Sequence, residues 1–218
     1  MNTAETSPKA RLRRKSARPA ELLAAALDVF VERGYAASRM DDIAKRAGVS
    51  KGTVFLYYES KQALFRAVVE AAVVPHLEAG EALLARDEAE PEALMRALFA
   101  GYWRVLGDPR LSGIPKLVMA EAGNFPEVAT YYHEQVVLRG RAMFAEIYQR
   151  GVNAGVFHEA DPAVMCQLAL APLLFVCVWR TSLGVCDPGE LDLDVYVQTH
   201  VEMFMRGLKP ALPVRSDS

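Results

Sequence analysis

The first third of the chain carries apolar residues at the spacing of short amphipathic helices. The first apolar stripe lies between Pro19, which fits the first turn of a helix, and Gly34, which is typical of the residue after a helix. The stripe consists of Leu22, Leu23, Ala26, Leu27, Val29 and Phe30. Residues 1–17 are polar and basic without an apolar period, so we expect them to form a flexible arm.

Two further helices are predicted to meet at a tight turn. Ser38 and Asp41 have the pattern of a helix start, in which the serine caps and the aspartate favours the positive end. Gly48 is expected to end this helix, and only Val49 separates it from Ser50, which is a second capping serine. Because so short a connection makes two helices cross steeply, the pattern predicts a helix-turn-helix.

Helical spacing continues through the rest of the chain. Ser60 is predicted to cap a long helix that passes Pro75 and ends near residue 86, and further helices are expected at residues 91–106, 110–122, 126–153, 162–183 and 190–207. No stretch shows the sustained two-residue alternation of a half-buried strand. The predicted fold is therefore all-α, with a three-helix domain at residues 18–64, a larger helical ligand-binding and dimerisation domain at residues 65–210, and a disordered tail at residues 211–218.

The charge of the chain is polarised, although its net charge is only −2. Residues 1–66 contain thirteen lysine and arginine residues against seven aspartate and glutamate residues, whereas the remainder contains twelve basic and twenty acidic residues. A basic N-terminal segment favours a polyanionic partner, and the acidic remainder would repel one.

The residues around Ser50 have the chemistry of a DNA contact. Ser50, Lys51, Gly52 and Thr53 fall at a predicted helix start, where backbone N–H groups favour phosphate. Gly52 costs helix stability, on the order of 1 kcal/mol relative to alanine, and close approach of the backbone to a ligand would explain its presence. A helix of this width fits the major groove of duplex DNA, where hydroxyl groups can bind phosphates or base edges.

In this region the sequence resembles the TetR family of transcriptional regulators. The resemblance lies in Gly34 and Tyr35, in Ser38 to Ala44, in Ala47 to Thr53, in Tyr57 and Tyr58, in Ser60 and Lys61, and in Ala63 and Leu64. It implies a homodimeric regulator whose helix-turn-helix binds a palindromic duplex operator. It further implies repression that ends when the C-terminal domain binds a small molecule.

The resemblance also implies which residues contact DNA. The expected contacts are Ser38, Ser50, Lys51, Gly52, Thr53, Phe55, Tyr57, Tyr58 and Lys61. Lys51, Tyr57 and Lys61 would bind the phosphate backbone, and Ser38 would touch phosphate at the start of the second helix. Gly52 and Thr53 would approach base edges.

Three positions leave the details of DNA recognition open. Phe55 and Leu56 cannot form hydrogen bonds through their side chains, so they favour contact with thymine methyl groups over polar base readout. Tyr58 is explained equally well as a DNA contact and as a core residue.

The C-terminal part is rich in large apolar side chains, which suit a pocket for a lipophilic or aromatic effector. The residues favoured for this pocket are Phe99, Trp103, Met119, Phe144 and Phe175. The apolar faces of the last two predicted helices, at about residues 162–183 and 190–207, indicate the dimer interface. A buried core within one chain would produce the same pattern.

Other function classes find less support. No catalytic, nucleotide-binding or metal-binding motif is present, so we expect neither an enzyme nor a cofactor or metal site. Cys166 and Cys177 are expected to be buried apolar residues, which leaves Cys186 as the thiol through which a redox-responsive regulator would act. A helical protein that binds a ligand or a protein partner without sequence-specific DNA binding is a further alternative.

The sequence also bears on where the protein acts. The N-terminus has no apolar segment typical of a signal peptide, and three cysteines do not make a disulfide framework. The longest uncharged stretch, residues 162–179, falls short of the roughly 20 apolar residues of a membrane-spanning helix. We therefore expect a cytoplasmic protein without a membrane partner.

Overall fold

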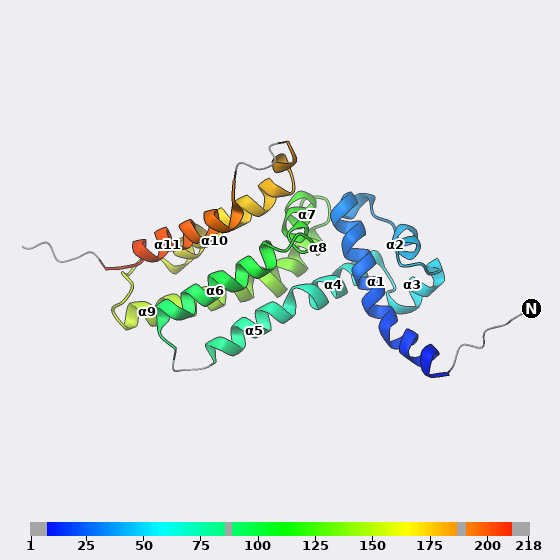
Figure 1. Cartoon of the computed structure of the whole chain (residues 1–218), viewed down its shortest axis with the longest axis horizontal. Helices are drawn as coiled ribbons and strands as arrows, with labels where there is room; N and C mark the ends of the chain where they lie inside the picture. Colours follow the sequence, from blue (N-terminus) through cyan, green and yellow to red (C-terminus); the bar gives the residue numbers. More distant parts are fainter. Residues whose placement is uncertain (1–7, 86–88, 187–190, 211–218) are drawn as a thin grey trace, which may run out of the picture.

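The computed structural model describes residues 8–85, 89–186 and 191–210, and over these residues the chain is helical without strands (Figure 1). The N-terminal unit consists of α1 (Pro8–Ala37), α2 (Met40–Arg46), α3 (Lys51–Tyr57) and α4 (Lys61–Ala72). The C-terminal unit consists of α5 (Val74–Leu84), α6 (Pro91–Leu106), α7 (Gly113–Glu121), α8 (Pro126–Tyr132), the π-helical turn η1 (His133–Val137), α9 (Leu138–Asn153), α10 (Pro162–Arg180), the 3₁₀ turn η2 (Leu183–Val185) and α11 (Leu193–Gly207). The predicted all-α class is confirmed.

The first helix begins earlier than the sequence predicts. α1 starts at Pro8 and contains Pro19, so at least residues 8–17 of the expected flexible arm are helical. Proline lacks a backbone N–H and is best tolerated in the first turn of a helix. The pattern therefore places the helix start at Pro19, whereas the helix also extends on the N-terminal side of this residue. Residues 1–7 of the arm and the expected tail at residues 211–218 lie outside the described residues.

Glycine and serine define the turns of the N-terminal unit. Gly34 leaves the helical conformation with φ 78° and ψ 166°, and Gly48 has φ 65°, a left-handed conformation that glycine adopts at least cost. The hydroxyl oxygen of Ser50 accepts from the backbone N–H of Thr53, and that of Ser60 accepts from Ala63. The predicted capping roles of these two serines are confirmed.

The predicted long helix after Ser60 is interrupted. It divides at Val73 (φ −113°, ψ −46°) into α4 and α5, with Pro75 in the first turn of α5. Proline cannot donate the backbone hydrogen bond of a helix interior, and its ring clashes with the preceding turn, so the break falls just before it.

Two hydrophobic cores hold the fold together. One lies among α1 to α4 and also receives Ile114, Leu117 and Val128 from α7 and α8. The other lies within the C-terminal unit and includes Met95, Phe144, Ile147, Tyr148, Leu173 and Met205. Because α7 and α8 contribute to the N-terminal core, the two units form a continuous structure.

Candidate DNA-binding face and effector cavity

One buried residue packs α3 against the N-terminal core, and the side chains on the opposite side of α3 face the solvent. Val54 is fully buried, whereas Phe55 and Leu56 are 43% and 79% exposed. Lys51 and Gly52 are also exposed. The second helix of the helix-turn-helix therefore presents a mixed apolar and polar face to solvent, as a reading helix requires.

The polar side chains of α3 make weak contacts that a nucleic acid could replace. Lys51 Nζ lies 3.0 Å from Asp41 Oδ2, and both side chains are 58% exposed. An exposed pair of this kind stabilises the fold by about 0–1 kcal/mol, so a phosphate can compete for the lysine. Thr53 Oγ1 lies 2.9 Å from Ser50 Oγ, which keeps both hydroxyl groups at the start of the helix.

Tyr57 and Tyr58 end the helix in half-buried positions. Both pack against the N-terminal core, and burial raises the pKa of Tyr58. Of the two readings that the sequence left open for Tyr58, this packing favours the core residue.

Lys61 is bound by backbone oxygens at the end of α1 and in the turn that follows. Its Nζ donates to the backbone oxygens of Tyr35, Ala36 and Ser38 at 2.6, 3.4 and 3.1 Å. It also lies 4.3 Å from the centre of the Tyr35 ring, and partial burial lowers its pKa. The lysine therefore holds the end of α1 and the following turn, and its predicted phosphate contact stays a prediction.

The expectations that Ser38 caps the second helix and touches phosphate are corrected. Ser38 is 2% exposed, and its Oγ donates to Gly34 O at 2.6 Å and Val29 O at 3.2 Å. The N-terminal cap of α2 is Arg39, which has no side-chain capping bond. Because Gly34 leaves the helix early, a carbonyl oxygen becomes available and takes the serine hydroxyl, which then neither caps α2 nor faces a phosphate.

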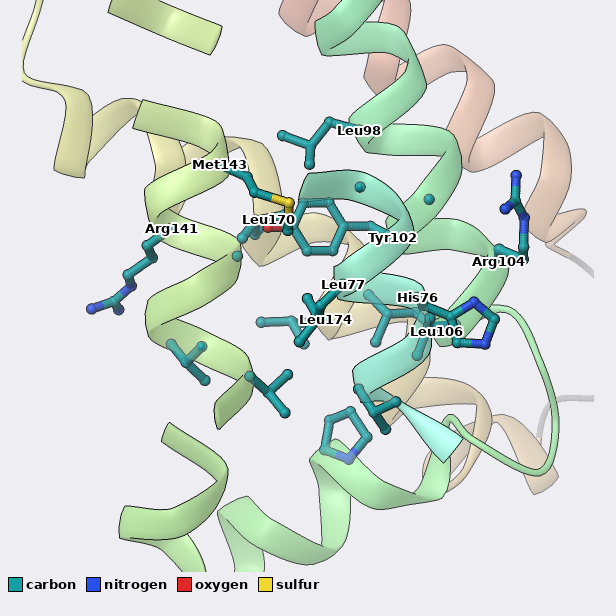
Figure 2. A pocket seen from close by; sticks show the side chains of 18 of the residues that line it. His76, Leu77, Leu98, Tyr102, Arg104, Leu106, Arg141, Met143, Leu170 and Leu174 are labelled. Atoms are coloured by element: carbon teal, nitrogen blue, oxygen red, sulfur yellow. The ribbon is translucent and has the colours of Figure 1, made fainter. Parts of the chain in front are cut away.

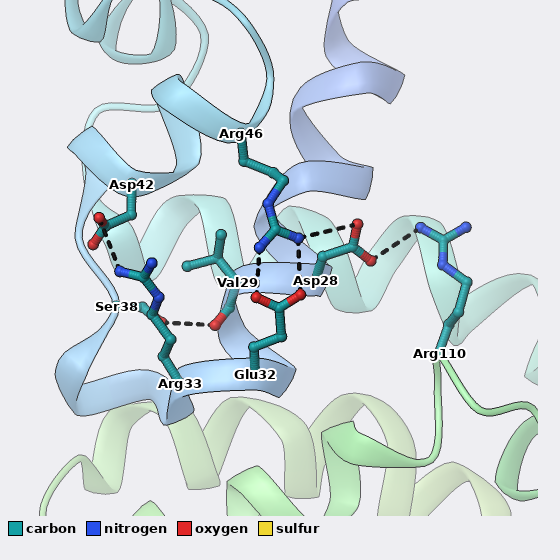
Figure 3. Close-up of polar contacts among 8 residues, drawn as sticks. All are labelled: Asp28, Val29, Glu32, Arg33, Ser38, Asp42, Arg46 and Arg110. Atoms are coloured by element: carbon teal, nitrogen blue, oxygen red, sulfur yellow. Dashed lines mark hydrogen bonds and ion pairs between the residues drawn. The ribbon is translucent and has the colours of Figure 1, made fainter.

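Ion pairs connect α1 with α2 and with the segment before α7 (Figure 3). Arg46 Nη1 donates to Glu32 Oε1 at 2.9 Å and lies 3.9 Å from Asp28 Oδ2, while Arg110 Nη2 lies 3.4 Å from the other oxygen of Asp28. The hydrogen bond from Arg46 lowers the pKa of Glu32. Arg33 pairs with Asp42 at 2.9 Å.

α7 contacts α1 closely at two points. The Glu121 carboxylate accepts from the backbone N–H of Ala36 at 2.9 Å, which is two residues before Ser38. At the other end of α7, a Cβ on Gly113 would lie 2.5 Å from Val31 Cγ1, so only glycine allows this approach. A shift of α7 would therefore move α1 and the turn that leads into the helix-turn-helix.

The C-terminal unit encloses an apolar cavity of about 390 Å³, within the usual range for small-molecule sites (Figure 2). Its lining comes from α5, α6, α7, α8, η1, α9 and α10 and includes Leu77, Leu98, Leu106, Met143, Leu170 and Leu174. Pro115, Val118 and Met119 of α7 also line it, so the helix that contacts α1 forms part of the cavity wall.

Only one of the five residues predicted for the effector pocket lies in this lining, namely Met119. Phe99 and Phe144 are buried and pack around Phe204, while Trp103 Nε1 donates to Asp194 at 2.9 Å. Phe175 is 61% exposed and packs on Trp179. These large rings fill the core or the outer surface, and the cavity is left where smaller side chains face one another.

Small residues are the sequence signal that points to the cavity. Its walls contain Ala79, Gly80, Ala97, Gly101, Ala122, Ala129 and Gly140. A Cβ on Gly101 would meet nothing within 4 Å, whereas one on Gly140 would lie 2.7 Å from the Tyr102 hydroxyl. Without knowing which helix faces meet, the sequence does not distinguish these residues from the glycines and alanines of ordinary helix contacts.

The outer surface of α10 and α11 exposes large apolar side chains. Val164, Leu168 and Phe175 of α10 are 52–61% exposed, and Val195 and Met203 of α11 are 57% and 68% exposed. α10 is also the one helix of the described residues long and apolar enough to cross a membrane by length and composition. Exposed patches of this kind mark interaction surfaces.

The cysteines and metal-ligating side chains offer no second site of comparable definition. Cys166 and Cys177 are buried, burial raises the pKa of both thiols, and Cys177 Sγ donates to Ser112 O at 3.0 Å. Cys186 is exposed. Within the part of the chain that the structure describes, no three histidine, cysteine, aspartate or glutamate side chains gather as metal donors.

A helix-turn-helix with an outward reading helix, joined to a helical unit with an apolar cavity, defines a ligand-responsive DNA-binding regulator. Residues 22–68 match the family of bacterial regulatory proteins of the tetR type, and residues 93–207 match the C-terminal domain of AefR-like transcriptional repressors. The chain belongs to the TetR family of transcriptional regulators, and the predicted resemblance is confirmed. Members of this family bind DNA and small-molecule ligands and act as dimers.

Individual relatives agree with this assignment. The chain is 26% identical over 162 residues to the HTH-type transcriptional regulator YfiR of Bacillus subtilis, covering 72% of this chain and 76% of that protein. It shares its fold with FadR of Bacillus subtilis in complex with stearoyl-CoA (TM-score 0.63, 19% identity, 86% and 98% of the two chains). The fold is also that of SmeT in complex with triclosan (TM-score 0.71, 20% identity, 89% and 93% coverage).

Proposed function

We propose that this regulator is a cytoplasmic repressor that leaves a palindromic operator when a small lipophilic molecule enters the cavity of its C-terminal unit. The observation that carries the proposal is the position of α7, which lines the cavity with Val118 and Met119 and holds α1 through Glu121. The similarity of the C-terminal unit to a repressor domain supports repression. The apolar lining, and relatives of the same fold that bind stearoyl-CoA and triclosan, support a lipophilic effector.

The proposed route of communication uses contacts between α7 and α1. An effector that packs against Val118 and Met119 favours one position of α7, and that position is transmitted to Ala36 through Glu121 and to Val31 through Gly113. A ligand shifts such an equilibrium only by its different affinity for the two states. The effector-bound state would therefore space the two helix-turn-helix units of a dimer wrongly for successive major grooves.

The dimer is proposed to form through the exposed apolar faces of α10 and α11. Val164, Leu168 and Phe175 follow one side of α10 at helical spacing, and Val195 and Met203 do so on α11. Two-fold pairing would bury this surface against its own copy. It also accounts for the membrane-like composition of α10 without a membrane.

Selection of random duplex DNA by the purified protein, followed by fluorescence anisotropy on the selected sequence, tests the proposal. We expect a palindromic sequence whose binding weakens steeply with salt, because each bound phosphate releases counterions. A protein that stays folded and enriches no sequence over bulk DNA would contradict sequence-specific regulation and favour a ligand-binding or partner-binding role.

Replacing Lys51 by alanine is expected to weaken binding to all duplex sequences about equally and to flatten the salt dependence. The slope of log K against log salt should fall by about 0.9 for each phosphate that the variant no longer neutralises. Lys209 provides a matched control because its side chain is also 58% exposed and also pairs with one carboxylate, that of Glu92 at 3.6 Å. Lys209→Ala should leave the slope unchanged, and equal slopes for both variants would remove Lys51 from the DNA interface.

A further inference from the structure

The apolar cavity contains one buried polar atom without a partner. Tyr102 extends from α6 into the cavity (Figure 2), and no donor or acceptor of the described residues lies within hydrogen-bond distance of its hydroxyl. Burial raises the pKa of this phenol well above its usual value, so it stays protonated and can donate. Buried polar groups almost always have a partner, so a hydroxyl placed in this way points to a ligand acceptor.

The Tyr102 hydroxyl lies close to α9 at Gly140. A Cβ on Gly140 would lie only 2.7 Å from the Tyr102 oxygen, so the ring reaches across the cavity because position 140 has no side chain. The next residue, Arg141, also lines the cavity. A donor hydroxyl and a cationic side chain thus lie on adjoining parts of the same wall.

The charges around the cavity have one sign. Among the described residues, its lining contains Arg104 and Arg141, together with His76 and His133, and no aspartate or glutamate. This is unexpected in a part of the chain where acidic residues outnumber basic ones by twenty to twelve. Arg104 and Arg141 form no ion pair among the described residues, and their guanidinium groups extend from the walls toward the outside (Figure 2).

We propose that the effector is a lipophilic carboxylate whose apolar body fills the cavity and whose carboxylate accepts a hydrogen bond from Tyr102. Arg141 lies on the same wall with its guanidinium group directed outward, so its positive charge favours an anion over a cation without contacting the carboxylate. The apolar lining selects the body of the ligand, and Tyr102 selects its head group. This inference rests on the proposed function of the cavity as the effector site and adds the chemical class of the effector.

Three unbranched probes of ten carbons each test the head group: decanoate, decanol and decylamine. Binding to the full-length protein is measured by titration calorimetry, and release of the selected operator by anisotropy. Decanoate should bind most tightly and decylamine least. Tyr102→Phe should weaken decanoate binding roughly tenfold, which is what loss of one hydrogen bond to a charged group costs. Arg141→Gln should reduce the difference in binding affinity between decanoate and decylamine.

Tyr148→Phe is the matched control because it removes the same hydroxyl group from a tyrosine outside the cavity lining. Tyr148 donates to His158 O at 2.7 Å, so its variant should bind decanoate like the wild type. Decylamine binding as tight as decanoate binding, or a Tyr102→Phe variant with unchanged decanoate affinity, would overturn the proposed head-group selection.

Gly101→Leu separates failure of this inference from failure of the proposed function. Position 101 lines the cavity and has open space where a Cβ would lie, so leucine fills the cavity without a backbone clash. If Gly101→Leu abolishes binding of the probes and Tyr102→Phe changes nothing, the cavity is the effector site but Tyr102 does not select the ligand. If no probe binds while operator binding persists, the carboxylate class is wrong and the DNA-binding function stands.

Discussion

A Phe175→Glu variant is expected to sediment as a monomer at micromolar concentration and to lose operator affinity by roughly a hundredfold or more. Phe175 is 61% exposed and is the most exposed large apolar side chain of α10. In a two-fold interface each substitution occurs on both protomers, and an unpaired buried charge costs about 3–5 kcal/mol. Sedimentation velocity measures the dimer, and anisotropy measures the operator affinity.

Leu138→Glu is the control for a glutamate introduced into an exposed apolar position. Leu138 is 45% exposed at the start of α9 and belongs neither to the cavity lining nor to α10 and α11. This variant should remain a dimer and bind the operator normally. If both variants remain dimers, the α10 and α11 face is not the dimer interface, and its apolar residues require another partner.

Local signals account for the parts of the fold that the sequence predicts correctly. The caps at Ser50 and Ser60 and the turn at Gly48 depend on residues within four positions of one another, so their spacing is visible in the chain. The break at Val73 is missed by the prediction of one long helix, although its signal is local, because Pro75 cannot continue a helix interior. The extension of α1 to Pro8 has no such local signal, since a polar basic segment lacks the apolar period that marks a packed helix.

Long-range contacts account for the side-chain positions that the sequence does not predict. Lys61 is bound by carbonyl oxygens that lie more than twenty residues earlier in the chain, and their availability depends on the conformation of Gly34. Aromatic residues are poor predictors of the effector pocket, because a ring such as Phe144 fills space, whereas a cavity needs positions such as Gly101 that leave space. Which helix faces meet at that space is a property of tertiary packing.

The contacts of α7 explain why the two units respond together. Ile114 and Leu117 of α7 belong to the N-terminal core, while Val118 and Met119 line the cavity of the C-terminal unit. A short helix that packs in the N-terminal core and also lines the cavity of the C-terminal unit cannot move in one unit alone, because close-packed interiors transmit displacement. Glu121 adds a polar contact to the same path, directly before the helix-turn-helix.

Lys61→Met is expected to lower the free energy of unfolding by about 2–4 kcal/mol and the melting temperature by roughly 5–10 °C. The variant loses charge-assisted hydrogen bonds to Tyr35 O and Ser38 O and the cation–π interaction with the Tyr35 ring. The carbonyl oxygens at the end of α1 would then lack their donor while staying partly buried. Calorimetric unfolding of the unliganded protein measures the change.

The matched variant, Lys51→Met, should keep its stability and change its DNA binding, whereas Lys61→Met should do the reverse. Its lysine forms only an exposed pair with Asp41, so the melting temperature should change little, while the salt dependence of operator binding flattens. Lys61→Met, measured well below its melting temperature, should retain the wild-type salt slope. If it instead flattens that slope and leaves the melting temperature unchanged, Lys61 is a phosphate contact that moves onto DNA, and its bonds to α1 exist only in the free protein.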